Sequence, residues 1–170
     1  MSTYSATMSQ MADTSRLTDD EQRAWRSFVE MQHALQRHLA RHLQRDSGVS
    51  DSDFEILVNL SEATDGRMRA VDLAAVTQWE KSRLSHHLSR MEKRGLITRE
   101  PGDARYPEVV LTDDGLTAIE TAAPINAALV RRLFVDVLGP ERLEALGEMA
   151  DDVRAAIEAH RTDDCELGPR

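Results

Sequence analysis

The chain has 170 residues, of which 41% are hydrophobic and 30% charged, so it is long enough for one domain, or for one domain with arms that dimerise. This composition excludes a disordered protein, and no apolar run approaches the roughly 18 residues that a membrane span requires. The single cysteine, Cys165, cannot form an internal disulfide, and the first residues lack the apolar stretch of a signal peptide. We therefore expect a cytoplasmic protein that does not bind a membrane.

The formal net charge of −9 hides an uneven distribution along the chain. Residues 66–99 contain eight basic and three acidic residues, a net charge of +5, which leaves −14 for the rest. Residues 113–170 contain thirteen acidic and six basic residues. Because a polyanion responds to local charge, the basic segment is compatible with a nucleic-acid partner, although charge alone fits a solvated helix face equally well.

The first predicted element is a long amphipathic helix over residues 18–46. Thr18 and Glu21 have the spacing of a capping box at its start. Apolar residues recur at three-, four- and seven-residue intervals, which places them on related faces: Trp25, Phe28, Leu35, Leu39 and Leu43. Residues 1–17 show no such period and are expected to form a flexible arm, and the polar residues 162–170 a flexible tail.

Two further helices are predicted next. Ser50 and Asp53 repeat the capping pattern before a helix over residues 51–63. The stretch TDGR then breaks the helix, and a short apolar helix follows over residues 71–76. Together these elements predict the first half of a helix-turn-helix motif.

The second half of that motif is a helix over about residues 80–94, followed by a β wing. The helix has an apolar stripe that should hold it on the body of the domain, formed by Leu84, Leu88 and Met91. Strand candidates at 96–99 and 108–111 flank a loop that contains proline and glycine and is longer than a tight hairpin turn. We therefore predict a wing over about residues 97–111.

A second long helical region is predicted over residues 113–160. Thr112 caps it, Pro124 should bend it, and the Gly-Pro pair at 139–140 interrupts it. The spacing of its last apolar residues is close to that of a coiled coil: Leu143, Leu146, Ala150, Val153 and Ile157. Packed within one subunit, this region and residues 18–46 would form only a thin core, so we expect them to be the dimerisation region of a symmetric homodimer.

Several short motifs in the middle of the chain occur at spacings that indicate a family. Leu73 and Ala74 lie in the first helix of the motif, LSHHLSRMEKRGLITR begins at Leu84, and V-S-x-x-D-F begins at Val49. The wing contains the pattern D-x-R-x-x-x-V-x-L-T-x-x-G, formed by Asp103, Arg105, Val109, Leu111, Thr112 and Gly115. On these motifs the chain resembles the MarR family of transcriptional regulators. The resemblance implies a mainly α fold with a small β wing: a winged helix-turn-helix over residues 50–112, with long N- and C-terminal helices that dimerise.

The polar side of the helix over 80–94 is the expected DNA-reading surface, because an α-helix fits the major groove. The residues predicted to contact DNA near its N-terminal end are Lys81, Ser82, Ser85 and His86. Arg83 and Arg90 flank the apolar stripe, and their spacing leaves open whether they reach bases, phosphates or a neighbouring carboxylate. His87 leans toward the stripe and is expected to be a core histidine rather than a DNA contact.

On the wing, Arg105 lies at the expected tip, between Gly102 and Pro107. A flexible cation there can enter a narrow minor groove, and the family resemblance implies the same role. Asp103 is expected to support the wing by orienting an arginine, because phosphate repels a free carboxylate.

These residues predict a sequence-specific regulator that binds double-stranded DNA as a homodimer, with the helix in the major groove and the wing in the minor groove of a pseudo-palindromic operator. The resemblance implies a ligand-responsive repressor with a small-molecule effector between the helical region and the winged domain. Trp25 and Phe28 lie near that junction but are expected to be core residues. The sequence contains no Gly-rich phosphate loop, GxSxG motif or HExxH motif, so we assign no catalytic residue, no enzymatic activity and no cofactor.

Two alternatives stay open at this point. The first is a winged-helix protein–protein interaction module that has lost DNA binding and uses its acidic C-terminal helices. The second is a zinc-responsive regulator of the same fold, since His38 and His42 have a spacing that can chelate one metal ion together with a ligand from another element. We assign no metal ligand on this spacing alone.

Overall fold

The computed structural model describes residues 16–101 and 107–166 and divides into two compact units, residues 1–42 and 43–170. The predicted flexible arm, residues 1–17, therefore lies almost entirely outside the described residues. The predicted flexible tail, residues 162–170, begins too early, because helix α7 continues to Glu166 and only residues 167–170 lie outside the described residues. The described part of the first unit consists of the greater part of helix α2 (Asp19–Ser47), whose last turn belongs to the second unit.

The start of α2 is the predicted capping box. The backbone N–H of Thr18 donates to Glu21 Oε2 at 2.7 Å, and the backbone N–H of Glu21 donates to Thr18 Oγ1 at 3.3 Å. These bonds satisfy backbone donors that a helix start leaves without an intrahelical partner. The hydrogen bonds to Thr18 lower the pKa of the Glu21 carboxyl.

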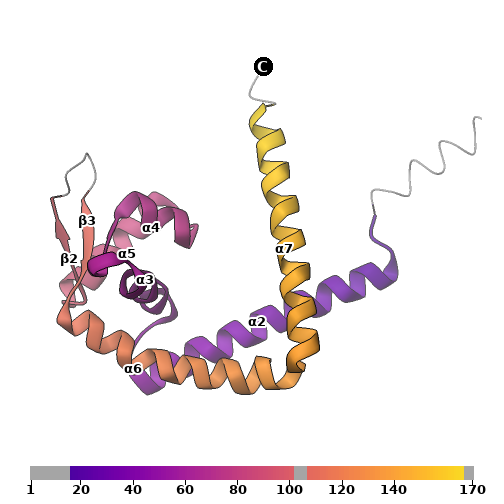
Figure 1. The fold of residues 1–170 in the computed structure, drawn as a ribbon, viewed down its shortest axis with the longest axis horizontal. Coiled ribbons are helices and arrows are strands. Elements are labelled where there is room, and N and C mark those ends of the chain that lie inside the picture. Colours follow the sequence, from indigo (N-terminus) through magenta and orange to yellow (C-terminus); the bar gives the residue numbers. More distant parts are fainter. Residues whose placement is uncertain (1–15, 102–106, 167–170) are drawn as a thin grey trace, which may run out of the picture. The chain divides into compact units, whose positions relative to one another are not determined.

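The second unit contains the remaining elements of the chain (Figure 1). After the end of α2 they follow in this order: α3 (Asp51–Glu62), a 3₁₀ turn η1 (Thr64–Gly66), β1 (Arg67–Arg69), α4 (Ala70–Thr77), α5 (Lys81–Lys93), β2 (Ile97–Glu100), β3 (Glu108–Leu111), α6 (Asp113–Val130), a π-helical turn η2 (Arg131–Val135) and α7 (Asp136–Glu166). The helix-turn-helix is thus α4 and α5, within one residue of the predicted boundaries.

Local signals explain where these helices begin and end. Ser50 and Asp53 form the predicted capping box of α3, and Thr112 Oγ1 accepts from the backbone N–H of Gly115 at 3.0 Å at the start of α6. Gln78 ends α4 in the left-handed conformation, with φ of 55°, and Gly95 follows α5 with φ of 77°. A non-glycine residue in this conformation occupies the turn of the helix-turn-helix, where the chain must change direction.

The sheet has three antiparallel strands in the order β1-β3-β2, one more than the predicted two-stranded wing. Val109 at its centre pairs with Met68 on one side and with Arg99 on the other. The prediction missed β1 because three residues after a turn carry no periodic signal, and the pairing that makes them a strand is with a segment far along the chain.

The core of the second unit lies between α3, α4, α5, the sheet and the first half of α6. Its most deeply buried apolar side chains are Leu43, Ile56, Leu57, Leu60, Leu73, Met91, Ile97, Val109 and Ala122. Full burial of an aliphatic side chain of this size contributes about 1.5–3 kcal/mol. Three of these residues lie on α3, so α3 is the helix against which both the helix-turn-helix and the sheet are held.

Gly115 is required by a close approach rather than by its backbone conformation. A Cβ at this position would lie 2.1 Å from the carbonyl oxygen of Leu96 and 2.8 Å from a methyl group of Leu111. The glycine of the T-x-x-G motif therefore lets α6 begin in direct contact with the backbone that leads into β2.

The C-terminal helices confirm one predicted interruption and add another. Gly139 leaves the helical conformation, with φ of 72° and ψ of 171°, where the sequence predicts a break. The π-helical turn η2 before it was not predicted, and Pro124 lies inside α6. Within the described residues no helix is both long enough and apolar enough to cross a membrane.

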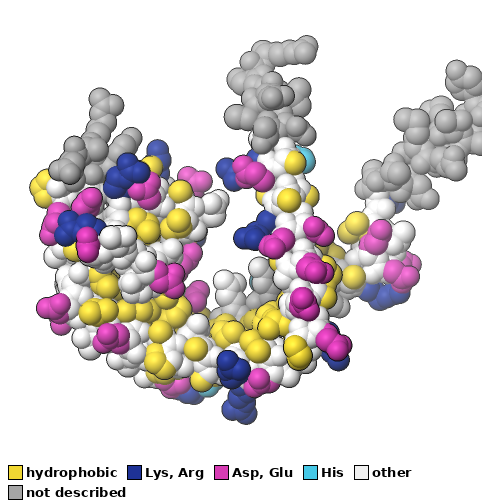
Figure 2. All heavy atoms as spheres, in the orientation of Figure 1, with side chains coloured by type: hydrophobic (Ala, Val, Ile, Leu, Met, Phe, Trp, Pro, Cys, Tyr) yellow, Lys and Arg dark blue, Asp and Glu magenta, His cyan; other side chains and the backbone are white. Residues whose placement is uncertain are grey.

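Apolar side chains remain exposed on two of the long helices. Trp25 and Phe28 are 58% and 45% exposed on α2, so the prediction that they are core residues is wrong for the single chain. Their rings contact each other, with centroids 5.8 Å apart. Figure 2 shows apolar side chains between acidic ones along α7, and those most exposed are Val137, Met149, Val153 and Ile157. Helical periodicity identifies an apolar face but not whether the same chain covers it.

Candidate nucleic-acid interface

Helix α5 has one buried side and one exposed side. Leu84, His87, Leu88 and Met91 are buried and recur at three- and four-residue spacing. The residues predicted to contact DNA, Lys81, Ser82, Ser85 and His86, are all exposed. The buried stripe therefore fixes α5 on the domain and leaves a polar surface of small side chains and a histidine in solvent.

One edge of that surface is held by α3 through Trp79. The guanidinium carbon of Arg83 lies 4.0 Å from the centroid of the Trp79 ring, a cation–π contact. The indole Nε1–H of Trp79 donates to Glu55 Oε2 at 3.1 Å. Burial raises the pKa of the Glu55 carboxyl, and the bond from Trp79 opposes that rise. The side chain of Arg83, in the N-terminal half of α5, is thus held against Trp79.

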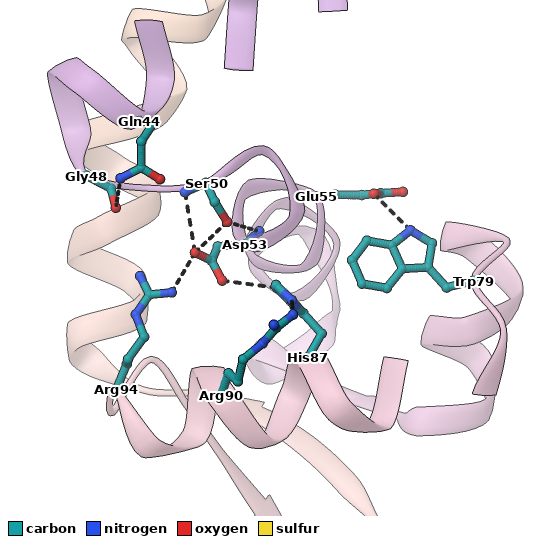
Figure 3. Close-up of polar contacts among 9 residues, drawn as sticks. All are labelled: Gln44, Gly48, Ser50, Asp53, Glu55, Trp79, His87, Arg90 and Arg94. Atoms are coloured by element: carbon teal, nitrogen blue, oxygen red, sulfur yellow. Dashed lines mark hydrogen bonds and ion pairs between the residues drawn. The ribbon is translucent and has the colours of Figure 1, made fainter. Parts of the chain in front are cut away.

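Further along the same edge, a buried carboxylate joins α3 to α5 (Figure 3). Asp53, only 1% exposed, accepts through Oδ2 from Ser50 Oγ–H at 2.7 Å and from the Arg94 guanidinium at 2.7 Å. Its backbone N–H also donates to Ser50 Oγ at 3.1 Å. The same side chain therefore caps α3 and anchors the C-terminal end of α5.

The second carboxylate oxygen of Asp53 faces His87. Oδ1 lies 3.1 Å from His87 Nε2, and the two atoms approach without a well-aligned hydrogen bond. On the other side of the imidazole, the Arg90 guanidinium lies 2.9 Å from His87 Nδ1. His87 is 6% exposed, so the prediction of a core histidine is confirmed, and it also contacts Arg90, one of the predicted DNA contacts.

Electrostatics in this cluster follow from burial and from the two arginines. Burial alone would raise the pKa of Asp53, but the hydrogen bonds from Arg94 and Ser50 and the charge of Arg94 outweigh it and hold the pKa below its ordinary value. Burial lowers the pKa of His87; Asp53 opposes this, and Arg90 and Arg94 add to it. At neutral pH the cluster therefore contains an ionised Asp53 and a neutral His87.

The opposite edge of α5 is held by the sheet. The Arg99 guanidinium on β2 donates to the carbonyl oxygen of Ser85 and to Ser89 Oγ, each at 3.0 Å. Beside it lies a cavity of about 190 Å³ between α4, α5 and the sheet, lined mostly by apolar side chains together with Lys81 and Arg99. A mainly apolar cavity with a few polar groups at its wall has the composition of a site for a small organic molecule.

The structure does not test two of the predicted site residues, because Asp103 and Arg105 lie outside the described residues. Nor does it complete a metal site. The rings of His38 and His42 lie with centroids 4.5 Å apart, but the described residues contain no group of three or more histidine, cysteine or carboxylate side chains placed to hold a metal ion. Zinc binding by this pair stays an open alternative, and no metal ligand is assigned.

Sequence reasoning missed the residues that position α5: Arg94, Trp79, Glu55 and Arg99. Asp53 and Arg94, which contact each other, are 41 residues apart in the sequence, and Glu55 and Trp79 are 24 residues apart. No local pattern reports such pairings. The one available signal was Trp79 itself, since a tryptophan in a turn usually needs a hydrogen-bond partner for its N–H when it is buried.

Comparison with known proteins bears on the function of this surface. A family model described as the MarR family matches residues 47–105. The chain is similar to AbsC, a MarR family transcriptional regulator from Streptomyces coelicolor, with 42% sequence identity, coverage of 85% of this chain and 98% of AbsC, and a TM-score of 0.81.

Two further relatives are also regulators of transcription. Sco3205, a MarR family transcriptional regulator from the same organism with a crystal structure in complex with DNA, is 38% identical, with coverage of 83% of this chain and 90% of Sco3205 and a TM-score of 0.79. The transcriptional regulator HosA of Escherichia coli O111:H- is 27% identical over 119 residues, which cover 69% of this chain and 87% of HosA. These relatives are regulators of transcription, not enzymes.

Proposed function

The chain belongs to the MarR family of transcriptional regulators, and we propose that it binds a pseudo-palindromic DNA operator as a homodimer, represses transcription there and responds to a small-molecule effector. The observation that carries the proposal is the exposed polar side of α5, which is held at both edges by contacts from α3 and from the sheet. A rigidly held helix with short polar side chains suits the reading of base edges in the major groove.

In the proposed complex, the N-terminal half of α5 enters the major groove. Lys81, Ser82, Ser85 and His86 contact bases or nearby phosphates, and Arg83 and Arg90 contribute positive charge from the edge of the helix. The crystal structure of Sco3205 in complex with DNA supports this role for the fold.

The wing supplies the minor-groove contact. We propose that Arg105 inserts into the minor groove next to the site read by α5, with Asp103 holding an arginine in place. The net charge of +5 over residues 66–99 supports the approach of this side of the domain to phosphate, although the whole chain is acidic.

The proposed dimer is formed by residues 18–46 and 113–160, outside the DNA-binding segment 50–112. The exposed apolar side chains on α2 and α7 support it, because monomeric soluble proteins rarely leave extended apolar faces in solvent. A symmetric dimer presents two α5 helices to half-sites about one helical turn apart, hence the pseudo-palindromic operator.

The cavity beside Arg99 supports a response to a small molecule, although it lies within the winged domain and not at the predicted junction with the helical region. Its apolar walls would take a small ring or chain, and Lys81 and Arg99 would take its negative charge. Because Lys81 is also a proposed DNA contact, an anion bound there would compete with DNA for the same cation. This arrangement favours release of the operator when the effector binds.

The experiment that tests the proposal is selection of bound sequences from random DNA duplexes, followed by titration at several salt concentrations. An enriched inverted repeat, bound with a log-affinity that falls steeply with log salt concentration, is the expected result. No enrichment and no salt-dependent binding would contradict it and favour the protein–protein interaction module. Loss of binding on chelation, restored by zinc in the wild type but not in His38→Ala, would make the regulator zinc-responsive.

Variants then separate specificity from general affinity. Ser82→Ala and His86→Ala should change the preferred bases at individual positions, at about 1–3 kcal/mol for each good contact, whereas Arg105→Ala should weaken binding to all sequences. Arg154→Ala on α7 is the matched control that removes one positive charge outside 50–112, and it should bind as the wild type does. Unchanged binding in the first three variants would contradict the proposed docking.

A further inference from the structure

Two arginines on the α3-facing edge of α5 each contact a ring that also contacts a carboxylate of α3. Arg83 stacks on the face of the Trp79 ring, and Trp79 donates from its edge to the carboxylate of Glu55 on α3. Arg90 meets the edge of the His87 ring, which faces Asp53. The second case contains a ring that can be protonated.

In that second arrangement, Arg90 and Asp53 lie on opposite sides of His87. A guanidinium has only N–H donors, so the contact of 2.9 Å between Arg90 and His87 Nδ1 requires Nδ1 to be the acceptor. A neutral imidazole then has its proton on Nε2, the atom that faces Asp53 Oδ1 at 3.1 Å. These contacts match a neutral His87 that carries its proton on Nε2, the tautomer we assign to it.

We propose that His87 is a proton-sensitive positioning residue for Arg90. Protonation places an N–H on Nδ1, which removes the acceptor that holds the guanidinium and brings two positive charges together. Arg90 then leaves the α3-facing edge and turns toward the exposed side of α5, where it adds a phosphate contact. This consequence for DNA rests on the proposed function, whereas the coupling between His87 and Arg90 does not.

The groups around His87 set the pH at which it is protonated and Arg90 is released. Asp53 faces it from α3, Arg90 and Arg94 from α5, and the uncharged Trp79 ring packs edge-on with its centroid at 5.3 Å, backed by Glu55. Burial together with the two arginines keeps the pKa of His87 below its ordinary value, against the attraction of Asp53. Release of Arg90 is therefore expected on acidification below about pH 6.5.

There is also space beside His87 for the Arg90 side chain to move. His87, Arg90 and Arg94 line an open pocket of about 410 Å³ together with Ser52 and Gln44. The pocket borders His87, and Arg90 is an exposed residue that can move without displacing a core side chain.

The first experiment needs no DNA. Side-chain ¹⁵N NMR of the full chain, followed from about pH 7.5 to about pH 5, should show the Nε2–H tautomer of His87 at the higher pH. The Arg90 guanidinium resonance should shift with the same midpoint as His87. In His87→Gln, an uncharged side chain that can accept from Arg90 and donate to Asp53, that shift should disappear. An Arg90 resonance that does not shift as His87 titrates would overturn the proposal.

The second experiment measures the effect on DNA, in a His86→Gln background that removes the other imidazole of α5 from the reading surface. Between about pH 7.5 and pH 5.5, the slope of log affinity against log salt should steepen by about 0.9, the value of one phosphate contact. The affinity loss between 50 and 200 mM salt then grows about 3.5-fold at the lower pH.

Matched variants decide the cause of that change. His87→Gln and Arg90→Gln should each abolish the pH dependence of the slope. Arg83→Gln, which removes the arginine that stacks on Trp79 rather than the one that contacts His87, should retain it. A pH-dependent slope that persists in His87→Gln would overturn the proposal. If the chain binds no DNA, the proposed function fails, and the NMR titration alone still decides whether His87 positions Arg90.

Discussion

Replacement of Arg94 by alanine should lower the free energy of unfolding by about 2–3 kcal/mol, because it leaves a buried carboxylate without its cation. Breaking a buried ion pair by removal of one partner costs about 3–5 kcal/mol, and the lower figure applies here because Arg94 itself is 48% exposed. Asp53 is 1% exposed and keeps its bonds from Ser50, which limit the loss further.

The loss should depend on pH in a defined direction. In the wild type the pKa of Asp53 lies below its ordinary value, so its stabilising contribution is present above about pH 3.9 and is lost as the pH falls through the folded-state pKa. In Arg94→Ala, burial acts with only the Ser50 bonds against it, so the pKa of Asp53 should rise. The difference between the two proteins should be largest near neutral pH and should vanish where Asp53 is protonated in both.

Urea unfolding at about pH 7 and at about pH 4, at one fixed protein concentration, measures both quantities. Arg154→Ala removes an exposed arginine paired with Asp151 and should have no measurable effect. In an Asp53→Asn background, Arg94→Ala should cost much less than in the wild type, since no buried charge is left behind. Two results would refute the reasoning. One is a loss of about 2–3 kcal/mol from Arg94→Ala in the Asp53→Asn background, and the other is a loss from Arg94→Ala in the wild type no larger than that from Arg154→Ala.

Three further substitutions test the fold and the dimer. Gly115→Ala should destabilise the protein by about 3 kcal/mol in urea unfolding, because its Cβ would meet a backbone carbonyl oxygen at 2.1 Å. The control Gly147→Ala, whose Cβ would have no atom within 4 Å, should stabilise α7 slightly. Ser50→Ala should cost about 1–2 kcal/mol through loss of the α3 cap, and an unchanged urea midpoint would contradict that role. Ile157→Asp should weaken self-association in sedimentation velocity, while Val76→Asp, equally exposed on α4, should not; equal behaviour of the two would argue against α7 as the dimer surface.

The sequence was sufficient where the determining contacts are local. Both capping boxes, at Thr18 and Ser50, and the break at Gly139 depend on residues within a few positions of one another, and all three were predicted. Strand β1 was not, because its three residues form a strand only by pairing with β3. The same limit applies to the reading surface.

At that surface the sequence identified which residues face solvent but not how they are held. The spacing of Leu84 and Leu88 is enough to predict the exposed side of α5. The contacts that position it from α3, through Asp53 and Trp79, join segments that the chain brings together only when folded. Periodicity also does not say whether an apolar face is covered within one chain, which is why Trp25, expected in a core, is exposed in the single chain.

An arginine held before binding would make the proposed DNA contact less costly. Immobilising a long, flexible side chain at an interface costs about 0.5–1.5 kcal/mol, and Arg83 already contacts the Trp79 ring, which a hydrogen bond to Glu55 joins to α3. Pre-organisation of Arg83 would then contribute about 0.5–1.5 kcal/mol to affinity without adding a contact, whereas Arg90 gains its proposed phosphate contact only on release from His87. The centre of the exposed side carries Ser82 and His86, which are free of such constraints and can adapt to base edges. Orientation and affinity would come from the edges of α5, and sequence preference from its centre.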